Sequence, residues 1–343
     1  MVLKMGGNLK IILPIIIPII GAIVVFFLNK LHNKTLSRTV FVSFTFITAI
    51  CCVINCFDTS GEFIMGYIAG EFPIEFKIDE LGVYFSLLTS LIWFVVAIYT
   101  CRYISHEENE NLFLGFYLLV YGILVALDYS ANIVTMYLFY ELMTVATLTL
   151  VLYSRTKEGI SAGLKYIAYS LFGAALGLVC ILFVVFYGDG IDFREGGVFT
   201  NSSVDKDILL IVTFLGIVGF GTKAGIFPLH GWLPIAHPVA PAPASAVLSG
   251  ILTKSGVLAI IRLVYYIVAA DLIRGEWVQY AWIILALTTV LMGSLLAYKE
   301  KNLKKRLAYS TVSQVSYILF GLALLEESAF AGAMMHIAFH SVI

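Results

Sequence analysis

Ionisable side chains inside apolar stretches are the residues of this chain best suited to chemistry. Glu141, Lys223 and Lys254 each lie within a long run of apolar residues. A charged side chain at the centre of a membrane span costs about 2.5–3.5 kcal/mol on insertion scales, so such a residue is a functional-site hypothesis. Histidines accompany them, and an imidazole both accepts and donates protons near neutral pH. They are His230, His237, His336 and His340. The set predicts a path for protons or other ions.

Prolines are concentrated in the segment that holds Lys223, His230, His237 and Lys254. Five of the chain's eight prolines lie between Gly219 and Gly256. Proline breaks a helix, and a broken helix at membrane depth is tolerated only where protein or a water-filled cavity satisfies the freed backbone groups. The stretch therefore predicts a helix that breaks at Pro228 and lines an ion path. His230 and His237 are relay candidates there, although both could instead only satisfy freed backbone groups. His237 is the stronger relay candidate because it precedes an Ala-Pro-x-Pro sequence.

His336 and His340 are four residues apart and share one face of a helix. Two histidines at this spacing can bind a metal. No third ligand accompanies them in the sequence, so a polar pair is the favoured interpretation. The chain also has no Cys-x-x-Cys pair, and its five cysteines are predicted to be packing residues. We therefore expect no metal and no cofactor in this chain.

The composition is that of a membrane protein. Of the 343 residues, 60% are hydrophobic and 13% are charged, whereas a soluble chain is nearer half apolar and one quarter charged. The net charge of −1 gives no reason to expect a nucleic-acid partner. The partner that the composition implies is a lipid bilayer, and the expected location is the inner (plasma) membrane.

Membrane spans need roughly 20 mostly apolar residues, and ten complete spans are predicted. They lie near residues 9–28, 39–57, 81–103, 111–127, 132–153, 162–187, 207–227, 242–270, 277–298 and 307–325. An eleventh begins near Ala329 and is still running at Ile343. The glycines Gly173 and Gly177 form a small-xxx-small pattern that would permit close helix packing. Loops after odd-numbered spans hold twelve Lys and Arg residues against six on the other side. The positive-inside rule then places the N-terminus outside, although Lys4 and Lys10 argue against it.

The proline-rich stretch resembles a known family. The order is Lys223, the sequence PLHGWLP at 228–234, Ala236-His237, the sequence APAPASA at 240–246, and then Lys254. It resembles the antiporter-like membrane subunits. These include the proton-pumping subunits of respiratory complex I, the Mrp-type cation/proton antiporters, and the membrane arms of energy-converting hydrogenases and formate hydrogenlyases. The motif is specific for the superfamily, and the resemblance covers nearly the whole chain.

The resemblance implies roles for individual residues. Asn132 and the sequence YELM at 140–143 match the family segment that holds an essential glutamate, here Glu141. In the family that glutamate pairs with the lysine matching Lys223. Such a pair acts as a switch because a nearby carboxylate raises a lysine's pKa and desolvation lowers it. Lys254 matches the central lysine that links two half-channels. His336 and His340 match an HxxxH motif that the family follows with a lysine, and this sequence stops before that position.

The resemblance also implies an all-α fold of about fourteen spans with two inverted repeats of five. We predict one antiporter-like membrane domain over residues 1–343. Its spans four to eight, about 111–270, would form the first half-channel repeat. Residues 277–343 would be an incomplete second repeat. The sequence therefore predicts a truncated chain or a companion chain that completes the fold.

The predicted function is proton translocation, or sodium/proton exchange, within a multi-subunit energy-converting complex. The path would use Glu141, Lys223, Lys254 and the four histidines. Redox chemistry would then reside in partners: other membrane subunits and a soluble redox arm of the kind found in NADH:quinone oxidoreductases or membrane-bound hydrogenases. One alternative is an Mrp-type sodium/proton antiporter subunit without redox partners. Another is a membrane scaffold with no ion path.

Overall fold

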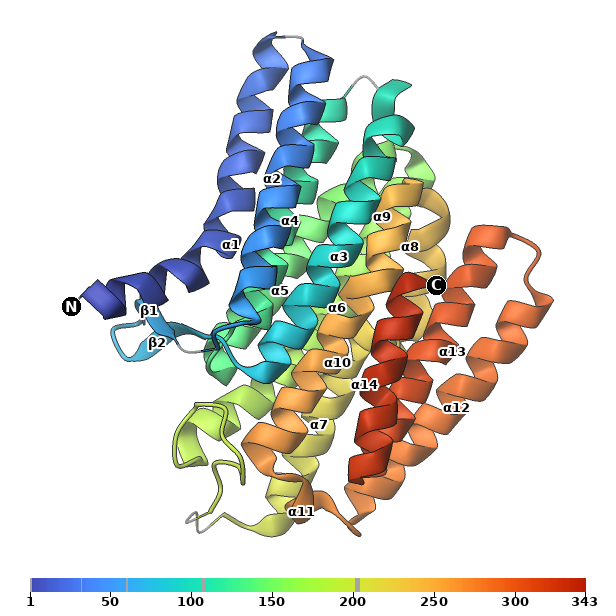
Figure 1. Ribbon diagram of the computed structural model, residues 1–343. Coiled ribbons are helices and arrows are strands. Elements are labelled where there is room, and N and C mark those ends of the chain that lie inside the picture. Colours follow the sequence, from blue (N-terminus) through green and yellow to red (C-terminus); the bar gives the residue numbers. More distant parts are fainter. Residues whose placement is uncertain (1, 32, 60, 107–108, 201–203) are drawn as a thin grey trace. The chain divides into compact units, whose positions relative to one another are not determined.

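A computed structural model describes residues 2–31, 33–59, 61–106, 109–200 and 204–343, most of them helical (Figure 1). Among these residues, nine helical segments are long and apolar enough to cross a membrane by length and composition. They are Asn8–Leu28, Lys34–Asn55, Glu80–Tyr103, Glu110–Asp128, Ile133–Ser154, Lys157–Tyr187, Lys206–Val239, Ala242–Val268 and Trp277–Lys299. The tenth and eleventh predicted spans coincide with α13 (Leu303–Ala323) and α14 (Glu327–Val342), which are outside this group. The polytopic helical character is confirmed, and the number of spans stays a prediction.

The chain forms two compact units, and the first comprises Met1–Ser154 and Pro241–Val247. Its elements are α1 (Val2–Leu28), η1 (Asn29–Leu31), α2 (Lys34–Asn55), β1 (Glu62–Ile68), β2 (Phe72–Lys77), α3 (Glu80–Tyr103), η2 (Ile104–His106), α4 (Glu110–Asp128), α5 (Ile133–Val151), η3 (Leu152–Ser154) and α9 (Ala242–Val247). The core of this unit holds charge as well as apolar side chains. Glu110 is 2% exposed. Two guanidinium nitrogens of Arg38 donate to it, one of them Nη2 at 2.9 Å from Oε2.

The second unit comprises Arg155–Ala240 and Leu248–Ile343. Its elements are α6 (Lys157–Tyr187), α7 (Lys206–Ala224), η4 (Leu229–Trp232), α8 (Leu233–Val239), η5 (Leu248–Leu252), α10 (Thr253–Ile261), η6 (Arg262–Val268), α11 (Ala270–Ile273), α12 (Trp277–Lys299), α13 and α14. Two of these, η5 and η6, are π-helical and flank α10. Such π-helical turns are rare and are frequent at functional sites.

A β-hairpin occupies the connection between α2 and α3, where the sequence pattern predicts no strands. β1 and β2 pair antiparallel, and the turn uses positive φ at Ala69 (53°) and Gly70 (76°). The outer edge of β2 bonds to the α4–α5 connection, where Ala131 N donates to Glu75 O at 3.0 Å. Asn132 caps α5 by accepting from Thr135 N at 2.8 Å. The hairpin therefore fixes the start of the helix that carries Glu141.

The predicted break in the seventh span is confirmed, but it begins before Pro228. α7 ends at Ala224 because Gly225 adopts the left-handed conformation, with φ of 81°. Gly225 N donates to Thr222 O at 3.1 Å and Ile226 N donates to Gly221 O at 2.9 Å. This is the Schellman arrangement that closes a helix C-terminus. The chain then continues as η4 and α8, and protein groups satisfy the backbone where the helix breaks.

Close packing of α6 and α7 agrees with the small-xxx-small pattern. A Cβ placed on Gly219 would lie 2.6 Å from the carbonyl oxygen of Gly173 and 2.6 Å from the nitrogen of Gly177. A Cβ on Gly173 would lie 2.5 Å from the hydroxyl of Thr222. Only glycine allows the two backbones to approach this closely. The consequence is that residues near the end of α7 lie directly against α6.

Side chains cap the end of α13 before the turn into α14. Tyr265 Oη donates to Leu322 O at 2.8 Å, and Arg274 Nη2 donates to Leu325 O at 2.6 Å. Gln279 Nε2 donates to the carbonyls of Ala323 and Leu324 at 3.0 and 3.1 Å. The last carbonyls of a helix have no partner within that helix. These three side chains therefore bond carbonyls at the end of α13 and in the turn that follows it.

Gln279→Leu should destabilise the protein while keeping a similar side-chain volume. Gln279 is 9% exposed, and leaving a buried hydrogen-bonding group unsatisfied costs about 1–3 kcal/mol. The melting temperature of the purified protein in detergent, followed by thermal shift, should fall by several degrees. Tyr280→Leu is the matched control, because Tyr280 is the next residue of α12 and is 58% exposed. An equal loss in both variants would argue against the capping role.

Candidate functional site

The predicted relay residues are distributed over six elements. Glu141 lies in α5, Lys223 in the last turn of α7, His230 in η4, His237 in α8, Lys254 in α10, and His336 and His340 in α14. Glu141 belongs to the first unit, and the other six belong to the second. Within the second unit the structure brings Lys254 and His340 together. The pairing of Glu141 with Lys223 stays a prediction.

Lys223 is held by α6 through two hydroxyl groups. Its exposed fraction is 1%, and its Nζ lies 2.7 Å from Tyr166 Oη and 2.9 Å from Ser170 Oγ. The same Nζ lies 4.3 Å from the ring centroid of Tyr166 and 5.8 Å from that of Trp232. Aromatic faces attract cations at such distances. Hydroxyl oxygens and aromatic rings in contact with the lysine therefore both stabilise its ammonium form.

Lys254 is the second buried lysine whose ammonium group contacts polar groups of the protein. It is 1% exposed, and its Nζ lies 2.6 Å from Nδ1 of His340 and 2.6 Å from the carbonyl oxygen of Ser249. An ammonium has three donors and no acceptor, whereas a neutral imidazole nitrogen can accept. A proton on Lys254 is thus already directed at His340. These two residues are 86 positions apart in the sequence.

The π-helical turn η5 shapes the surroundings of Lys254. Ser249 lies in this turn, and its carbonyl oxygen also accepts from Thr253 Oγ1 at 2.9 Å. Its hydroxyl lies 2.6 Å from Thr311 Oγ1 of α13. The wider turn of a π-helix changes the backbone hydrogen-bond register. The Ser249 carbonyl is therefore shared between the Thr253 hydroxyl and the Lys254 ammonium group, and this contact orients the lysine.

His336 and His340 lie on one face of α14, as predicted. Their rings are stacked with centroids 6.2 Å apart and an interplanar angle of 19°. His336 also packs edge-on against Tyr317 at 6.2 Å. Across the described ranges, no group of three or more His, Cys, Asp or Glu residues could hold a metal ion. His340 contacts Lys254, and His336 lies next to His340 on the same face of α14, so the polar side chains continue along this helix.

His230 and His237 lie in the broken segment. The His230 ring stacks on Phe227 with centroids 6.0 Å apart. Its Nδ1 atom is buried and accepts or donates no hydrogen bond within the described part of the chain. Stacking, and not a backbone bond at this nitrogen, therefore fixes the ring of His230. His237 is 4% exposed. Its assignment as a relay residue stays a prediction.

Glu141 lies near the middle of α5, two turns beyond the Asn132 cap. Its side chain is half-buried, and its Oε1 atom is fully buried. Tyr137 is four residues earlier on the same helix, so it shares a helix face with Glu141. The role of Glu141 in ion movement stays a prediction.

Tyr166 and Ser170 are site residues that the charged and proline-rich segments of the sequence do not identify. They are four residues apart in α6, so they share one face of the helix. Two hydroxyl side chains at this spacing within an apolar span were the available signal. Trp232 belongs to the motif, but its position against Lys223 could not be seen in the sequence. Its Nε1 donates to Thr222 O at 2.8 Å, and its ring packs edge-on against Tyr166 at 5.1 Å.

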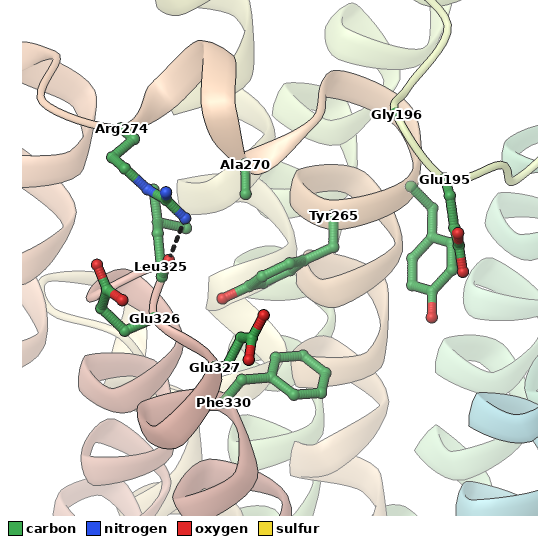
Figure 2. A pocket seen from close by; sticks show the side chains of 10 residues that line it. Glu195, Gly196, Tyr265, Ala270, Arg274, Leu325, Glu326, Glu327 and Phe330 are labelled. Carbon is green, nitrogen blue, oxygen red and sulfur yellow. Dashed lines mark hydrogen bonds between the residues drawn. The ribbon is translucent and has the colours of Figure 1, made fainter.

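A pocket of about 380 Å³ lies elsewhere in the second unit (Figure 2). It is lined by Glu195, Gly196, Tyr265, Tyr266, Ala270, Arg274, Leu325, Glu326, Glu327 and Phe330. None of the predicted relay residues is in this lining. Tyr265 and Arg274 direct their polar groups to the end of α13, and Figure 2 shows the bond from Arg274 to Leu325. The pocket is therefore separate from the candidate ion path.

Fold and site together define a polytopic membrane protein with ionisable side chains buried inside its spans. Residues 130–343 match the family model described as NADH:quinone oxidoreductase/Mrp antiporter, TM. The chain therefore belongs to the NADH:quinone oxidoreductase/Mrp antiporter transmembrane family, and the resemblance inferred from the motif is confirmed.

Individual relatives agree with this assignment. The chain is 31% identical over 350 residues to the hydrogenase-4 component F homolog of Methylacidiphilum infernorum, covering 96% of this chain and 69% of that protein. It is 25% identical over 338 residues to a Na(+)/H(+) antiporter subunit of Alkalihalophilus pseudofirmus, covering 98% and 68%. A chain of the membrane-bound sulfane sulfur reductase, an archaeal respiratory membrane complex, has the same fold with a TM-score of 0.83 at 22% identity. That match covers 97% of this chain and 68% of the other. The all-α class of a polytopic membrane protein is confirmed, with the β1–β2 hairpin as its one sheet among the described residues.

Proposed function

We propose that this chain moves protons, or exchanges protons for sodium, as a membrane subunit of a multi-subunit energy-converting complex. The observation that carries the proposal is the 2.6 Å contact between Lys254 Nζ and His340 Nδ1. It joins two proton-exchanging groups from different elements within apolar surroundings. Buried ionisable residues in membrane proteins mark ion pathways and proton relays. The names of two relatives, a hydrogenase-4 component and an antiporter subunit, support membership of a larger assembly.

Each relay residue has a proposed role. Glu141 modulates the proton affinity of Lys223, and His230 and His237 carry protons through the broken segment. Lys254 passes the proton to His340, and His336 continues the path. The chain itself would carry no redox centre, so oxidation and reduction, where they occur, belong to partner subunits. We place the complex in the plasma membrane with the N-terminus outside.

Lys254→Met should reduce ion translocation by about 100-fold or more, the scale of a lost acid–base group. Methionine keeps the unbranched shape but cannot carry a proton. The assay is proton or sodium uptake by proteoliposomes containing the purified complex, read with a pH-sensitive or sodium-sensitive dye. Lys165→Met is the matched control, since Lys165 is an exposed lysine of α6. Full transport by Lys254→Met in an assembled complex would rule out the proposed path and favour a scaffold role.

The alternative of an Mrp-type antiporter without redox partners is favoured by the sodium/proton antiporter protein among the relatives. Metal analysis and mass spectrometry of the intact complex separate the two assemblies. Stoichiometric iron or nickel together with hydrogenase-like or quinone-reductase-like subunits identifies a redox-driven pump. Membrane partners alone, without these metals, identify an antiporter.

A further inference from the structure

We propose that Tyr166 and Ser170 form a hydroxyl cradle that holds Lys223 in both of its protonation states. Tyr166 is then a positioning residue for proton exchange at Lys223. The inference rests on the proposed function, because it matters only if Lys223 takes up and releases a proton. It adds two side chains of α6 to the ion path. It also connects the broken segment to this path, because Trp232 packs on Tyr166.

The geometry of the cradle is set by three elements. Tyr166 Oη and Ser170 Oγ come from α6 and lie 2.7 and 2.9 Å from Lys223 Nζ at the end of α7. Both hydroxyl-bearing residues are buried, at 0% and 2% exposure. Trp232 from η4 packs on the Tyr166 ring at 5.1 Å. The amine is thus held from one side by hydroxyls and from another by aromatic rings.

The chemistry of the cradle suits a group that changes charge. A hydroxyl both donates and accepts hydrogen bonds, whereas an ammonium only donates. The charged lysine therefore donates to Tyr166 and Ser170. After losing its proton, the amine has a lone pair that can accept from the same hydroxyls, so the contact survives with its direction reversed. A carboxylate alone would favour only the charged state.

The cradle is also held in place from both sides. The close approach of α6 and α7 at Gly173 and Gly219 leaves no room for a side chain between the two helices, so the face of α6 that carries Tyr166 and Ser170 lies against the end of α7. Trp232 is tied to α7 by its hydrogen bond to Thr222 O at 2.8 Å. The ring of Tyr166 is therefore fixed by the motif residue Trp232. Trp232 of the broken segment therefore holds the Tyr166 ring in position next to Lys223.

Tyr166→Phe and Ser170→Ala test the cradle in the assembled complex reconstituted in proteoliposomes. The phenylalanine keeps the ring and its packing on Trp232 and removes only the hydroxyl. Transport should fall about tenfold in Tyr166→Phe. The pH at half-maximal transport should shift down by about one unit, because the charge-assisted hydrogen bond that the ammonium loses is stronger than the one that the neutral amine loses. Ser170→Ala should shift it in the same direction by less.

Matched controls lie on the same helix. Tyr169→Phe and Ser161→Ala remove hydroxyls at other positions of α6, and both should keep the wild-type pH profile. Other charged or titratable groups on elements packed against α7 are unchanged in every variant. They include Lys165, His230, Lys254, Arg262, Lys299 and Lys304.

The outcomes separate the cradle from the proposed function. Lys223→Ala is measured alongside. If Lys223→Ala transports normally, the proposed function fails and the cradle fails with it. If Lys223→Ala is inactive while Tyr166→Phe keeps both the wild-type rate and the wild-type pH profile, only the cradle is refuted. A fall in rate that Tyr169→Phe reproduces, with no shift of the pH profile, would also refute it and identify a structural effect.

Discussion

Lys223→Ala is expected to abolish ion translocation by the assembled complex, lowering its rate by at least about 100-fold. Lys223 is 1% exposed and belongs to the α7 end that the Schellman turn and Trp232 hold in place. Alanine removes the only group of this side chain that can carry a proton. The measurement is ion uptake by proteoliposomes, with complex assembly checked by mass spectrometry of the detergent-purified sample.

Lys223→Arg distinguishes proton exchange from a fixed charge at the same position. The guanidinium keeps the positive charge but does not lose its proton in proteins. A relay therefore requires Lys223→Arg to be inactive as well, and normal transport in this variant would contradict proton release by Lys223. Lys165→Ala, an exposed lysine on α6, should transport at the wild-type rate.

Glu141→Gln is the companion variant, because glutamine has the same shape but holds no charge. If Glu141 raises the proton affinity of Lys223, its neutralisation removes that effect and ion coupling is lost. Transport should fall as far as in Lys223→Ala, and the complex should still assemble. Unchanged transport would exclude the predicted pairing of Glu141 with Lys223.

The ionisable residues of the site could be predicted because membrane spans rarely contain charged side chains. A lysine or carboxylate inside an apolar run is costly, so Glu141, Lys223 and Lys254 stand out without any structure. The break after α7 was predictable from Pro228. The structure places its start three residues earlier, at Gly225, because a left-handed glycine and a Schellman turn end the helix first.

The contacts of these residues could not be predicted, because they depend on packing between distant segments. Lys254 and His340 are 86 positions apart and meet only after α10 and α14 fold against their neighbours. Ser249 contributes its carbonyl through a π-helical turn that no sequence period identifies. Tyr166 and Ser170 are common residue types, and they acquire a role only when glycines bring α6 against α7. The hairpin was not predicted because its strands, of seven and six residues, are too short to span a membrane and lie in a connection between two spans.

Gly219→Val should be among the most damaging single substitutions in the second unit. Its Cβ would lie 2.6 Å from the carbonyl oxygen of Gly173 and 2.6 Å from the nitrogen of Gly177, and backbone atoms cannot rotate away. Overpacking costs up to about 3 kcal/mol, and we expect the upper end of this range. Separation of the helices would also move Lys223 away from Tyr166 and Ser170, so stability and transport should fall together.

Gly332→Val is the matched control for this substitution. Gly332 is also within a helix, and a Cβ placed there meets nothing within 4 Å. The intrinsic effect of replacing helical glycine with valine is then shared by both variants. The melting temperature in detergent should drop strongly in Gly219→Val and change little in Gly332→Val. If both variants melt alike, the close approach of α6 and α7 does not limit stability. The position of Lys223 against its cradle would then have to depend on Trp232 and the turn at Gly225 alone.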